Sequence, residues 1–442
     1  MLKPQKALAV AALLASVACG NSPTQKDTVL APIPSNDDDS GDVLQFPRKA
    51  AIVDIIFPGD DDDDSVVDGE DGEDGESIVG EGEGEGIPQG EGEGEGEGEG
   101  EVITPPPPPP TTRETRPAAS LGQGFFVKNG TVFDKNGSEF IMRGLNHSHA
   151  WGHQDNAVRA IPEFVEMGAN SVRLVFMPTL GGGTTPAGRR ALVETYIANG
   201  LVPIVEDHRT TCSDDPSTLR AAVNTWLEPG NVAWLQQYED KVILNIGNEW
   251  MNTSWDHDLW VSEYSAAIVR LRAAGIHALI MVDAGGGCAQ NPRSIRDRGQ
   301  DIVDADPEHN VVFDLHMYAY WRSSTAGVGS WNDHGLGSPW SIEAELQGIK
   351  DRGLAVIVGE LGDSSSPQVG YDTKSALETL KRLNIGFLAW SWNSNSDASL
   401  DLSVDNMGWR YDSTDDLTAG GRLFIEDADV GMQATAQVPD IF

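Results

Sequence analysis

The stretch Val242-Ile-Leu-Asn-Ile-Gly-Asn-Glu-Trp250 decides how this chain is interpreted. It begins as an apolar, β-branched run that is typical of a buried parallel strand, and it ends at an acidic residue, Glu249. A second stretch, Leu354-Ala-Val-Ile-Val-Gly-Glu360, has the same form. In α/β proteins, sites are assembled where parallel strands end. Two carboxylates at one such edge can act as an acid/base and a nucleophile, so the pattern predicts an enzyme.

Similar apolar runs recur along residues 118–442, and helical patterns lie between them. Eight strands with intervening helices predict a single α/β domain folded as a (β/α)8 TIM barrel. A doubly wound sheet is the alternative, because periodicity does not show whether a sheet closes. The predicted strands are Glu139–Asn146, Ser171–Phe176, Val202–Val205, Val242–Ile246, Leu279–Val282, Val311–Leu315, Ala355–Val358 and Ile385–Ala389. The clearest helical patterns are Asn156–Met167, Pro216–Gln237 and Asp258–Ala274.

A β-hairpin is predicted before the barrel. The segment that begins at Phe125 contains Asn129-Gly130 and Asn136-Gly137, and both pairs are signals for tight hairpin turns.

The first 19 residues have the pattern of an export signal. Lys3 and Lys6 precede an apolar stretch, Ala7 to Ala18, that is too short to span a bilayer. Cys19 then follows in a sequence that resembles a bacterial lipoprotein cleavage box. We expect lipid attachment at Cys19 and a location at the bacterial cell surface or outer membrane. Ordinary cleavage after Ala18, with secretion, is the alternative.

Residues 20–117 are predicted to be a disordered acidic linker. They hold 27 acidic and five basic residues, a net charge of −22 within the −39 of the whole chain. A Glu-Gly alternation runs from Gly80 to Glu101, and six prolines follow from Pro105 to Pro110. Glycine keeps the repeat flexible, its like charges repel one another and extend it, and the proline run is semi-rigid. The acidity argues against nucleic acid as a partner, whereas a neutral polysaccharide is compatible with it.

Export makes a disulfide possible between the two remaining cysteines, Cys212 and Cys288, which both fall in loops after predicted strands. Two unpaired thiols are the alternative, and the sequence does not decide between them.

Polar and aromatic residues stand just past each predicted strand. In a barrel these ends converge on one face, where active sites are assembled. In chain order the residues are Asn146, His147, His149, Trp151, Arg173, Glu206, His208, Asn248, Glu249, Trp250, Asp283, His316, Tyr318, Glu360, Trp390 and Trp392.

From about residue 120 to 430 the chain resembles glycoside hydrolase family 5, a retaining family of cellulases and mannanases. The resemblance rests on motifs in the family's order, namely Arg173, His208, Asn248-Glu249, His316-x-Tyr318, Glu360 and Trp390. Within this family the chain is particularly similar to the bacterial endo-β-1,4-mannanase branch. The motifs that carry this similarity are Arg143-Gly-Leu-Asn-His-Ser-His149, Ile246-Gly-Asn-Glu-Trp250 and Leu388-Ala-Trp-Ser-Trp392.

The resemblance implies a role for each residue. Glu249 would be the general acid/base, and Glu360 the nucleophile that forms a glycosyl-enzyme. Arg173 would keep Glu360 ionised, and Tyr318 would form a hydrogen bond to Glu360. Asn248 would bind the sugar 2-hydroxyl, whereas His208 and His316 would orient carboxylates or bind hydroxyls. A sugar would stack on Trp390, and the residues expected to contact neighbouring sugars are His149, Trp151 and Trp392. Trp250, Trp255, Tyr320 and Trp321 are further aromatic residues that could either bind sugar or pack.

We therefore expect a retaining endo-acting hydrolase of β-1,4-linked mannan or glucomannan. The alternatives are a β-1,4-endoglucanase with the same mechanism and a catalytically silent glycan-binding lipoprotein. Histidines at 147, 149, 208 and 316 superficially suggest zinc, but no His-Glu-x-x-His motif is present, so we expect neither metal nor cofactor. The protein is expected to be a monomer whose only contact with a membrane is the lipid at Cys19.

Overall fold

The structure, a computed structural model, describes residues 113–442 apart from 152–153, 254–255, 322, 326–327 and 330–339. The predicted export signal, the anchor at Cys19 and nearly all of the linker lie outside the described residues and stay predictions, as does any role of Trp255. No helix within the described part of the chain has both the length and the apolar character needed to cross a membrane.

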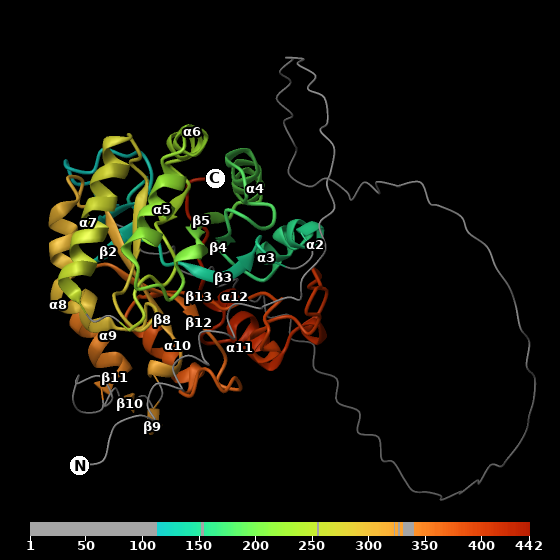
Figure 1. Cartoon of the computed structure of the whole chain (residues 1–442). Helices are drawn as coiled ribbons and strands as arrows, with labels where there is room; N and C mark the ends of the chain where they lie inside the picture. Colours follow the sequence, from blue (N-terminus) through green and yellow to red (C-terminus); the bar gives the residue numbers. More distant parts are fainter. Residues whose placement is uncertain (1–112, 152–153, 254–255, 322, 326–327, 330–339) are drawn as a thin grey trace, which may run out of the picture. The chain divides into compact units, whose positions relative to one another are not determined.

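Eight parallel strands close into a barrel in the order β12-β13-β3-β4-β5-β6-β7-β8 (Figure 1). This closure confirms the predicted TIM barrel and excludes the doubly wound sheet. The strands are β3 (Arg143–Ser148), β4 (Ser171–Phe176), β5 (Val202–Asp207), β6 (Ile243–Asn245), β7 (Leu279–Asp283), β8 (Val311–Met317), β12 (Val356–Leu361) and β13 (Gly386–Ala389).

Helices surround the barrel (Figure 1). They are α2 (Gln154–Arg159), α3 (Ile161–Glu166), α4 (Pro186–Ala198), α5 (Pro216–Trp226), α6 (Pro229–Gln237), α7 (His257–Ala273), α8 (Pro292–Ala305), α9 (Ile342–Lys350), α10 (Thr373–Arg382), α11 (Ala419–Glu426) and α12 (Met432–Thr435). A small separate sheet contains β9 (Ser323–Thr325), β10 (Val328–Gly329) and β11 (Trp340–Ser341).

The helix predicted over Pro216–Gln237 is in fact two helices, α5 and α6. Pro229 begins the second helix, and Glu228 before it has a ψ of 134°, outside the helical range. A proline has no N–H to donate and disfavours helical backbone in the residue before it, so the pattern could not continue unbroken. The prediction over Asn156–Met167 also divides, into α2 and α3.

The predicted hairpin consists of β1 (Phe126–Lys128) and β2 (Thr131–Phe133), paired antiparallel. Its turn is Asn129-Gly130, with φ values of 52° and 72°, which is the left-handed backbone that this residue pair favours. Phe125 and Val132 pack with apolar residues that fill the barrel, among them Ile204, Met281 and Ile357. The hairpin therefore closes the amino-terminal end of the barrel.

Side chains inside the barrel change character along its axis. Because residues alternate in direction along a strand, every second residue of β5 and β7 faces inward. Val202, Ile204, Leu279 and Met281 belong to the apolar cluster beneath the site, and the next inward positions are Glu206 and Asp283. The lower half of the barrel is thus an apolar core, and the upper half carries charge.

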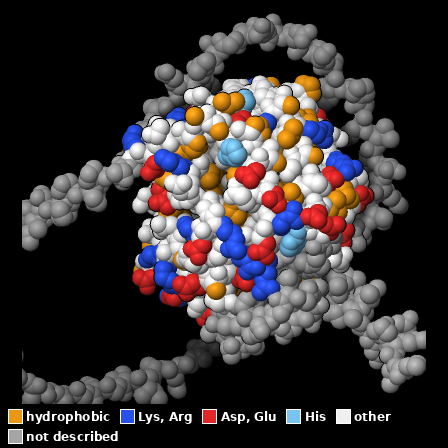
Figure 2. All heavy atoms as spheres, turned by 90° about the vertical axis from the view of Figure 1, so that its left-hand side faces the viewer, with side chains coloured by type: hydrophobic (Ala, Val, Ile, Leu, Met, Phe, Trp, Pro, Cys, Tyr) orange, Lys and Arg blue, Asp and Glu red, His pale blue; other side chains and the backbone are white. Residues whose placement is uncertain are grey.

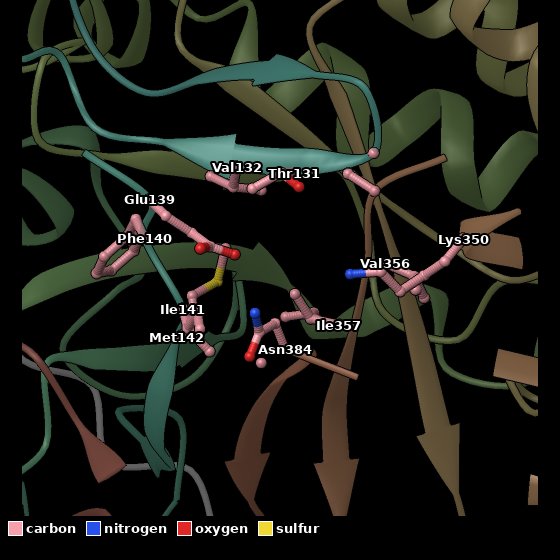
Figure 3. A pocket seen from close by; sticks show the side chains of 13 residues that line it. Thr131, Val132, Glu139, Phe140, Ile141, Met142, Lys350, Val356, Ile357 and Asn384 are labelled. Carbon is pink, nitrogen blue, oxygen red and sulfur yellow. The ribbon is translucent and has the colours of Figure 1, made fainter. Parts of the chain in front are cut away.

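A pocket lies at the closed end of the barrel, between β2, the start of β3 and β12 (Figure 3). Apolar side chains such as Val132, Met142 and Ile357 line it, and the polar ends of Glu139, Lys350 and Asn384 point into it. The face in Figure 2 has acidic and basic side chains interspersed, with only scattered apolar atoms between them. The residues that line the pocket include neither of the strand-end glutamates.

Candidate active site

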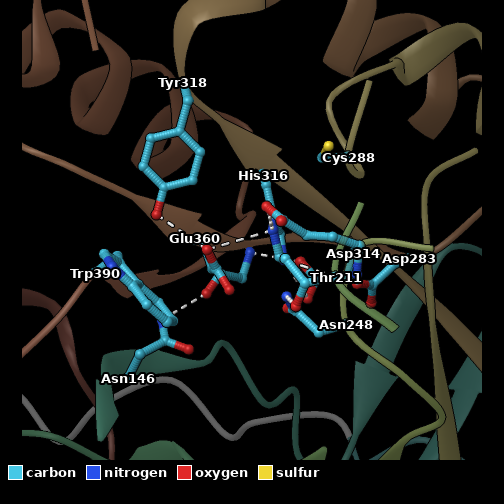
Figure 4. A network of polar contacts seen from close by, with 12 residues as sticks. Asn146, Thr211, Asn248, Asp283, Cys288, Asp314, His316, Tyr318, Glu360 and Trp390 are labelled. Carbon is cyan, nitrogen blue, oxygen red and sulfur yellow. Dashed lines mark hydrogen bonds and ion pairs between the residues drawn. The ribbon is translucent and has the colours of Figure 1, made fainter. Parts of the chain in front are cut away.

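Glu249 and Glu360 meet at the carboxyl-terminal mouth of the barrel, where Glu249 follows β6 and Glu360 belongs to β12. One oxygen of Glu249, one of Glu360 and a ring nitrogen of His316 all lie within 4.8 Å of one another. His316 Nδ1 is 2.9 Å from Glu249 Oε1 and 3.4 Å from Glu360 Oε2. Figure 4 shows the His316 imidazole beside Glu360. Glu249 and Glu360 are both buried, with exposed fractions of 8% and 3%.

Arg173, on β4, organises the floor of the site. It is fully buried, and its Nη1 donates to Glu360 Oε1 at 2.8 Å. Its Nη2 donates to Asn248 Oδ1 at 2.6 Å, and its Nε donates to Asn245 Oδ1 at 3.1 Å. A planar guanidinium bonded in this way has little rotational freedom, so it fixes the position of Glu360 and Asn248 together.

The other oxygen of Glu360 accepts a hydrogen bond from the Tyr318 hydroxyl at 3.0 Å (Figure 4). Asn248 donates from Nδ2 to Thr211 Oγ1 at 2.9 Å. An amide nitrogen carries two hydrogens, so Asn248 Nδ2 retains one for a further acceptor.

The charges of the site shift the pKa of its titratable groups. Burial alone would lower the pKa of His316, but Glu360, Asp314 and Glu249 outweigh it and hold that pKa well above its usual range. Burial raises the pKa of Glu360 to about 7, and the charge of Glu249 adds to the rise, whereas His316 and Arg173 oppose it. The site therefore holds a cationic imidazole beside Glu360, which keeps its proton to a higher pH than an ordinary carboxyl group.

Two aspartates lie below the pair. Asp283 Oδ2 accepts from the Glu249 backbone N–H at 2.7 Å, which fixes the start of the loop that carries Glu249. Asp314 Oδ1 accepts from the Gly359 N–H at 2.6 Å, and its Oδ2 forms an ion pair with His316 Nε2 at 3.6 Å. Neither Asp314 nor Asn245 was among the predicted site residues. The available signal was a polar residue at an inward position within an otherwise apolar strand.

Three aromatic rings line one side of the mouth. Trp390 follows β13, and the His208 ring lies nearly parallel to its indole at 5.8 Å, with 13° between the planes. Trp151 meets the His208 ring edge-on at 5.2 Å. The indole Nε1 of Trp390 donates to Asn395 Oδ1 at 2.9 Å, a partner that sequence analysis did not identify. Trp390 and Trp151 are half-buried, so both retain accessible surface.

Two of the residues expected to contact sugar are corrected by the structure. His149 is fully buried, and its Nε2 lies 2.8 Å from the Tyr196 hydroxyl in the layer between barrel and helices. Trp392 is also fully buried and packs on Phe164 of α3. Neither has surface to offer a ligand in the mouth. Trp250 and Trp321 are likewise buried, at 0% and 1% exposed, which identifies them as packing residues.

The structure also decides the state of the cysteines, because Cys212 and Cys288 form a disulfide. Cys212 lies shortly after β5 and Cys288 shortly after β7, so the bridge spans the loop after β6. The bridge is thus at the rim of the mouth, beside Glu249.

Comparison with known proteins agrees with this geometry. Residues 133–396 match the family model described as cellulase, glycosyl hydrolase family 5. The chain is 37% identical over 325 residues to a mannan endo-1,4-beta-mannosidase of Salipaludibacillus agaradhaerens, covering 72% of this chain and 96% of that protein. It is 31% identical over 288 residues to a beta-mannanase/endoglucanase A of Caldicellulosiruptor saccharolyticus, covering 61% of this chain and 20% of that protein.

Among solved structures, the chain is similar to the mannohexaose complex of Thermomonospora fusca β-mannanase. The TM-score is 0.61 at 29% identity, and the match covers 72% of this chain and 99% of the other. The family match spans more than half of the chain and includes both strand-end glutamates. The protein belongs to glycosyl hydrolase family 5, and it is a glycoside hydrolase homologous to endo-β-1,4-mannanases.

Proposed function

We propose that the enzyme cleaves β-1,4-linked mannan or glucomannan within the chain, with retention of configuration, using Glu249 as acid/base and Glu360 as nucleophile. The observation that carries this proposal is the separation of the two carboxylates, whose facing oxygens lie within 4.8 Å. Retaining enzymes hold the pair roughly 5 to 5.5 Å apart, whereas inverting enzymes need roughly 6.5 to 9.5 Å to admit a water.

In the first step Glu360 attacks the anomeric carbon, and the bond to the leaving oxygen breaks as Glu249 donates its proton to that oxygen. In the second step a water attacks the same carbon, Glu249 takes a proton from the water, and the ester bond to Glu360 breaks. Arg173 and Tyr318 donate to Glu360. Such donors favour its ionised form, which is the form that attacks. No cofactor is needed for either step.

The half-buried face of Trp390 is the stacking surface that we propose for the sugar at the point of cleavage, since flat apolar faces suit pyranose rings. His208 lies beside Trp390, and Trp151 lies beside His208. Together with Asn248 they would bind hydroxyls or neighbouring rings. Mannan is preferred as substrate because the relatives named above include mannan-cleaving enzymes and a mannohexaose complex. A β-1,4-glucan is the second candidate, because one relative is named as both mannanase and endoglucanase.

The test is reducing-sugar release from locust bean gum, glucomannan and carboxymethyl cellulose, with viscosity followed in parallel. We expect release from the first two and a fall in viscosity early in the reaction, which is the signature of internal cleavage. Release from carboxymethyl cellulose alone would contradict the mannan proposal and leave the mechanism intact. No release from any of the three would contradict the proposed activity.

The pH dependence of the reaction should reflect the ionisation of Glu360. Burial raises the pKa of Glu360 to about 7, so its carboxyl group is largely protonated below that pH and ionised above it. Because only the ionised carboxylate can attack, we expect kcat/KM for mannohexaose to fall as the pH drops below about 7. A profile that stays flat or rises as the pH falls through 7 would contradict this expectation.

Asn395 should position Trp390. Asp401 Oδ1 accepts from both the backbone N–H and Nδ2 of Asn395, at 3.0 and 2.7 Å, which turns the amide oxygen toward the indole. We expect Asn395→Ala to raise KM for mannohexaose about fivefold, as loss of one hydrogen bond worth about 1 kcal/mol implies, with a smaller change in kcat. Ser399→Ala, in the same loop region but bonded to Asp397, is the matched control and should leave KM unchanged.

A further inference from the structure

Three loops at the mouth are joined around Glu249. The Cys212 N–H donates to the Glu249 carbonyl at 2.9 Å, and the Cys288 N–H donates to the Met251 carbonyl at 3.0 Å. The disulfide then links the two outer loops to each other across the loop that carries Glu249. That middle loop is therefore held from both sides by backbone hydrogen bonds and enclosed by a covalent bond.

The backbone of these loops is unfavourable for residues that bear side chains. Glu249 and Met251 have φ values of 51° and 79°, and Cys212 and Cys288 have values of 53° and 57°. Left-handed backbone at residues other than glycine persists only where the surroundings impose it, and it concentrates at active sites. The disulfide is the only covalent constraint on these loops besides the chain itself within the described residues. It is thus placed to keep Glu249 in this conformation.

The disulfide also touches the carboxylate directly. Cys212 Sγ lies 3.4 Å from Glu249 Oε2, whereas the other oxygen, Oε1, faces His316 Nδ1 at 2.9 Å. A cationic His316 donates to Oε1, so the proton that Glu249 must deliver belongs on Oε2. A disulfide sulfur has no hydrogen to donate and is only a weak acceptor. The sulfur therefore lies against the oxygen that carries the acid proton, where it keeps water away without competing for that proton.

We propose that the Cys212–Cys288 disulfide is a positioning element for general acid catalysis, which holds Glu249 in its left-handed backbone conformation and shields its Oε2. The proposal rests on the proposed role of Glu249 as acid/base. Loss of the bridge should impair proton delivery to the leaving group more than attack by Glu360, because Glu360 is held separately by Arg173 and Tyr318.

The experiment compares two substrates that differ in their need for an acid. Mannohexaose has a poor leaving group that must be protonated, whereas a dinitrophenyl β-mannotrioside releases a phenolate that needs no proton. For the Cys212→Ala/Cys288→Ala variant, we expect kcat/KM for mannohexaose to fall about ten- to a hundredfold, the range for a displaced general acid. We expect kcat/KM for the dinitrophenyl substrate to change less than about threefold, because attack by Glu360 is unaffected.

Leu235→Ala is the matched control for general loss of stability, because Leu235 is a fully buried residue of α6 outside the mouth. It should lower the melting temperature without changing the ratio of the two kcat/KM values. Dithiothreitol should reproduce the selective loss in the wild-type enzyme and have no effect on the double variant. Circular dichroism establishes that each variant is folded.

Equal losses on both substrates, or no loss on mannohexaose, would overturn the proposal. The Glu249→Ala variant distinguishes a failure of the inference about the disulfide from a failure of the proposed function itself. If that single variant shows no selective loss on mannohexaose, then Glu249 is not the acid. If it shows the loss while the disulfide variant does not, then only the inference about the disulfide is wrong.

Discussion

Glu360→Gln is expected to lower kcat on mannohexaose by roughly 10⁴-fold or more. The reason is that an amide cannot attack the anomeric carbon and no other group can form the covalent intermediate in its place. Glutamine has nearly the shape of glutamate, and its amide oxygen still accepts from Arg173. The variant should therefore remain folded. Glu360→Ala should be equally inactive but less stable, because it removes one carboxylate partner from Arg173 and from His316 in a buried site.

A fluorinated mannosyl fluoride, which slows the second step, provides the direct measurement. Incubation should add the mass of one fluoromannosyl group to the wild-type protein, and peptide mapping should place it on Glu360. The Glu360→Gln variant should gain no mass. A label on any other carboxylate, or substantial activity in the glutamine variant, would contradict the role of Glu360 as nucleophile.

Glu249→Ala is expected to lower kcat/KM for mannohexaose by roughly 10²- to 10⁴-fold, the usual contribution of a general acid. The dinitrophenyl β-mannotrioside should retain most of its kcat/KM but turn over slowly, because the glycosyl-enzyme then lacks a base to activate water. Azide, which needs no base, should restore turnover and yield a β-mannosyl azide.

The configuration of that azide is the decisive result. A β product means two inversions and hence a covalent intermediate on Glu360, as proposed. An α product would mean that azide displaced the leaving group directly, which would contradict the retaining mechanism. Asp283→Asn serves as a comparison, because Asp283 accepts from the backbone N–H of Glu249 and from Asn245 Nδ2 rather than bonding to the Glu249 carboxylate, and it should give no azide rescue.

Much of the architecture could be predicted from periodicity. The run Ser171–Phe176 coincides with β4, and the pair Asn129-Gly130 forms the expected turn. Both signals are local, since they depend on backbone preferences and on burial of a single segment. The unbroken helix over Pro216–Gln237 was wrong for an equally local reason, the proline at 229.

The substrate-site predictions differ in outcome because a strand has two faces. Asn146 points into the barrel, where it donates to the Gly359 carbonyl at 2.8 Å. His147 and His149 are one and three positions further on, so alternation turns both toward the helices. The predicted site included residues from both faces of this strand end, whereas only one face is turned to the mouth. Trp392, two residues after Trp390, shows that alternation ceases once the strand has ended.

Pairing of Cys212 with Cys288 could not be decided from the sequence, because their proximity depends on β5 and β7 flanking β6 in the closed barrel. The same holds for Asn395 and Trp390, whose bond depends on the path of the loop after β13. Such contacts are set by tertiary structure, which single-segment patterns do not contain.

Both ends of the described chain lie at the hairpin-closed end of the barrel. The Arg113 guanidinium pairs with Asp440 at 3.0 Å, and the Glu114 N–H donates to the Gly137 carbonyl beside the hairpin. Ile441 belongs to the same apolar cluster as Phe125. For biotechnology this is a useful arrangement, because a resin or a fusion partner attached at either end would leave the mouth open to a bulky polymer. It also means that an expressed fragment should begin before Arg113.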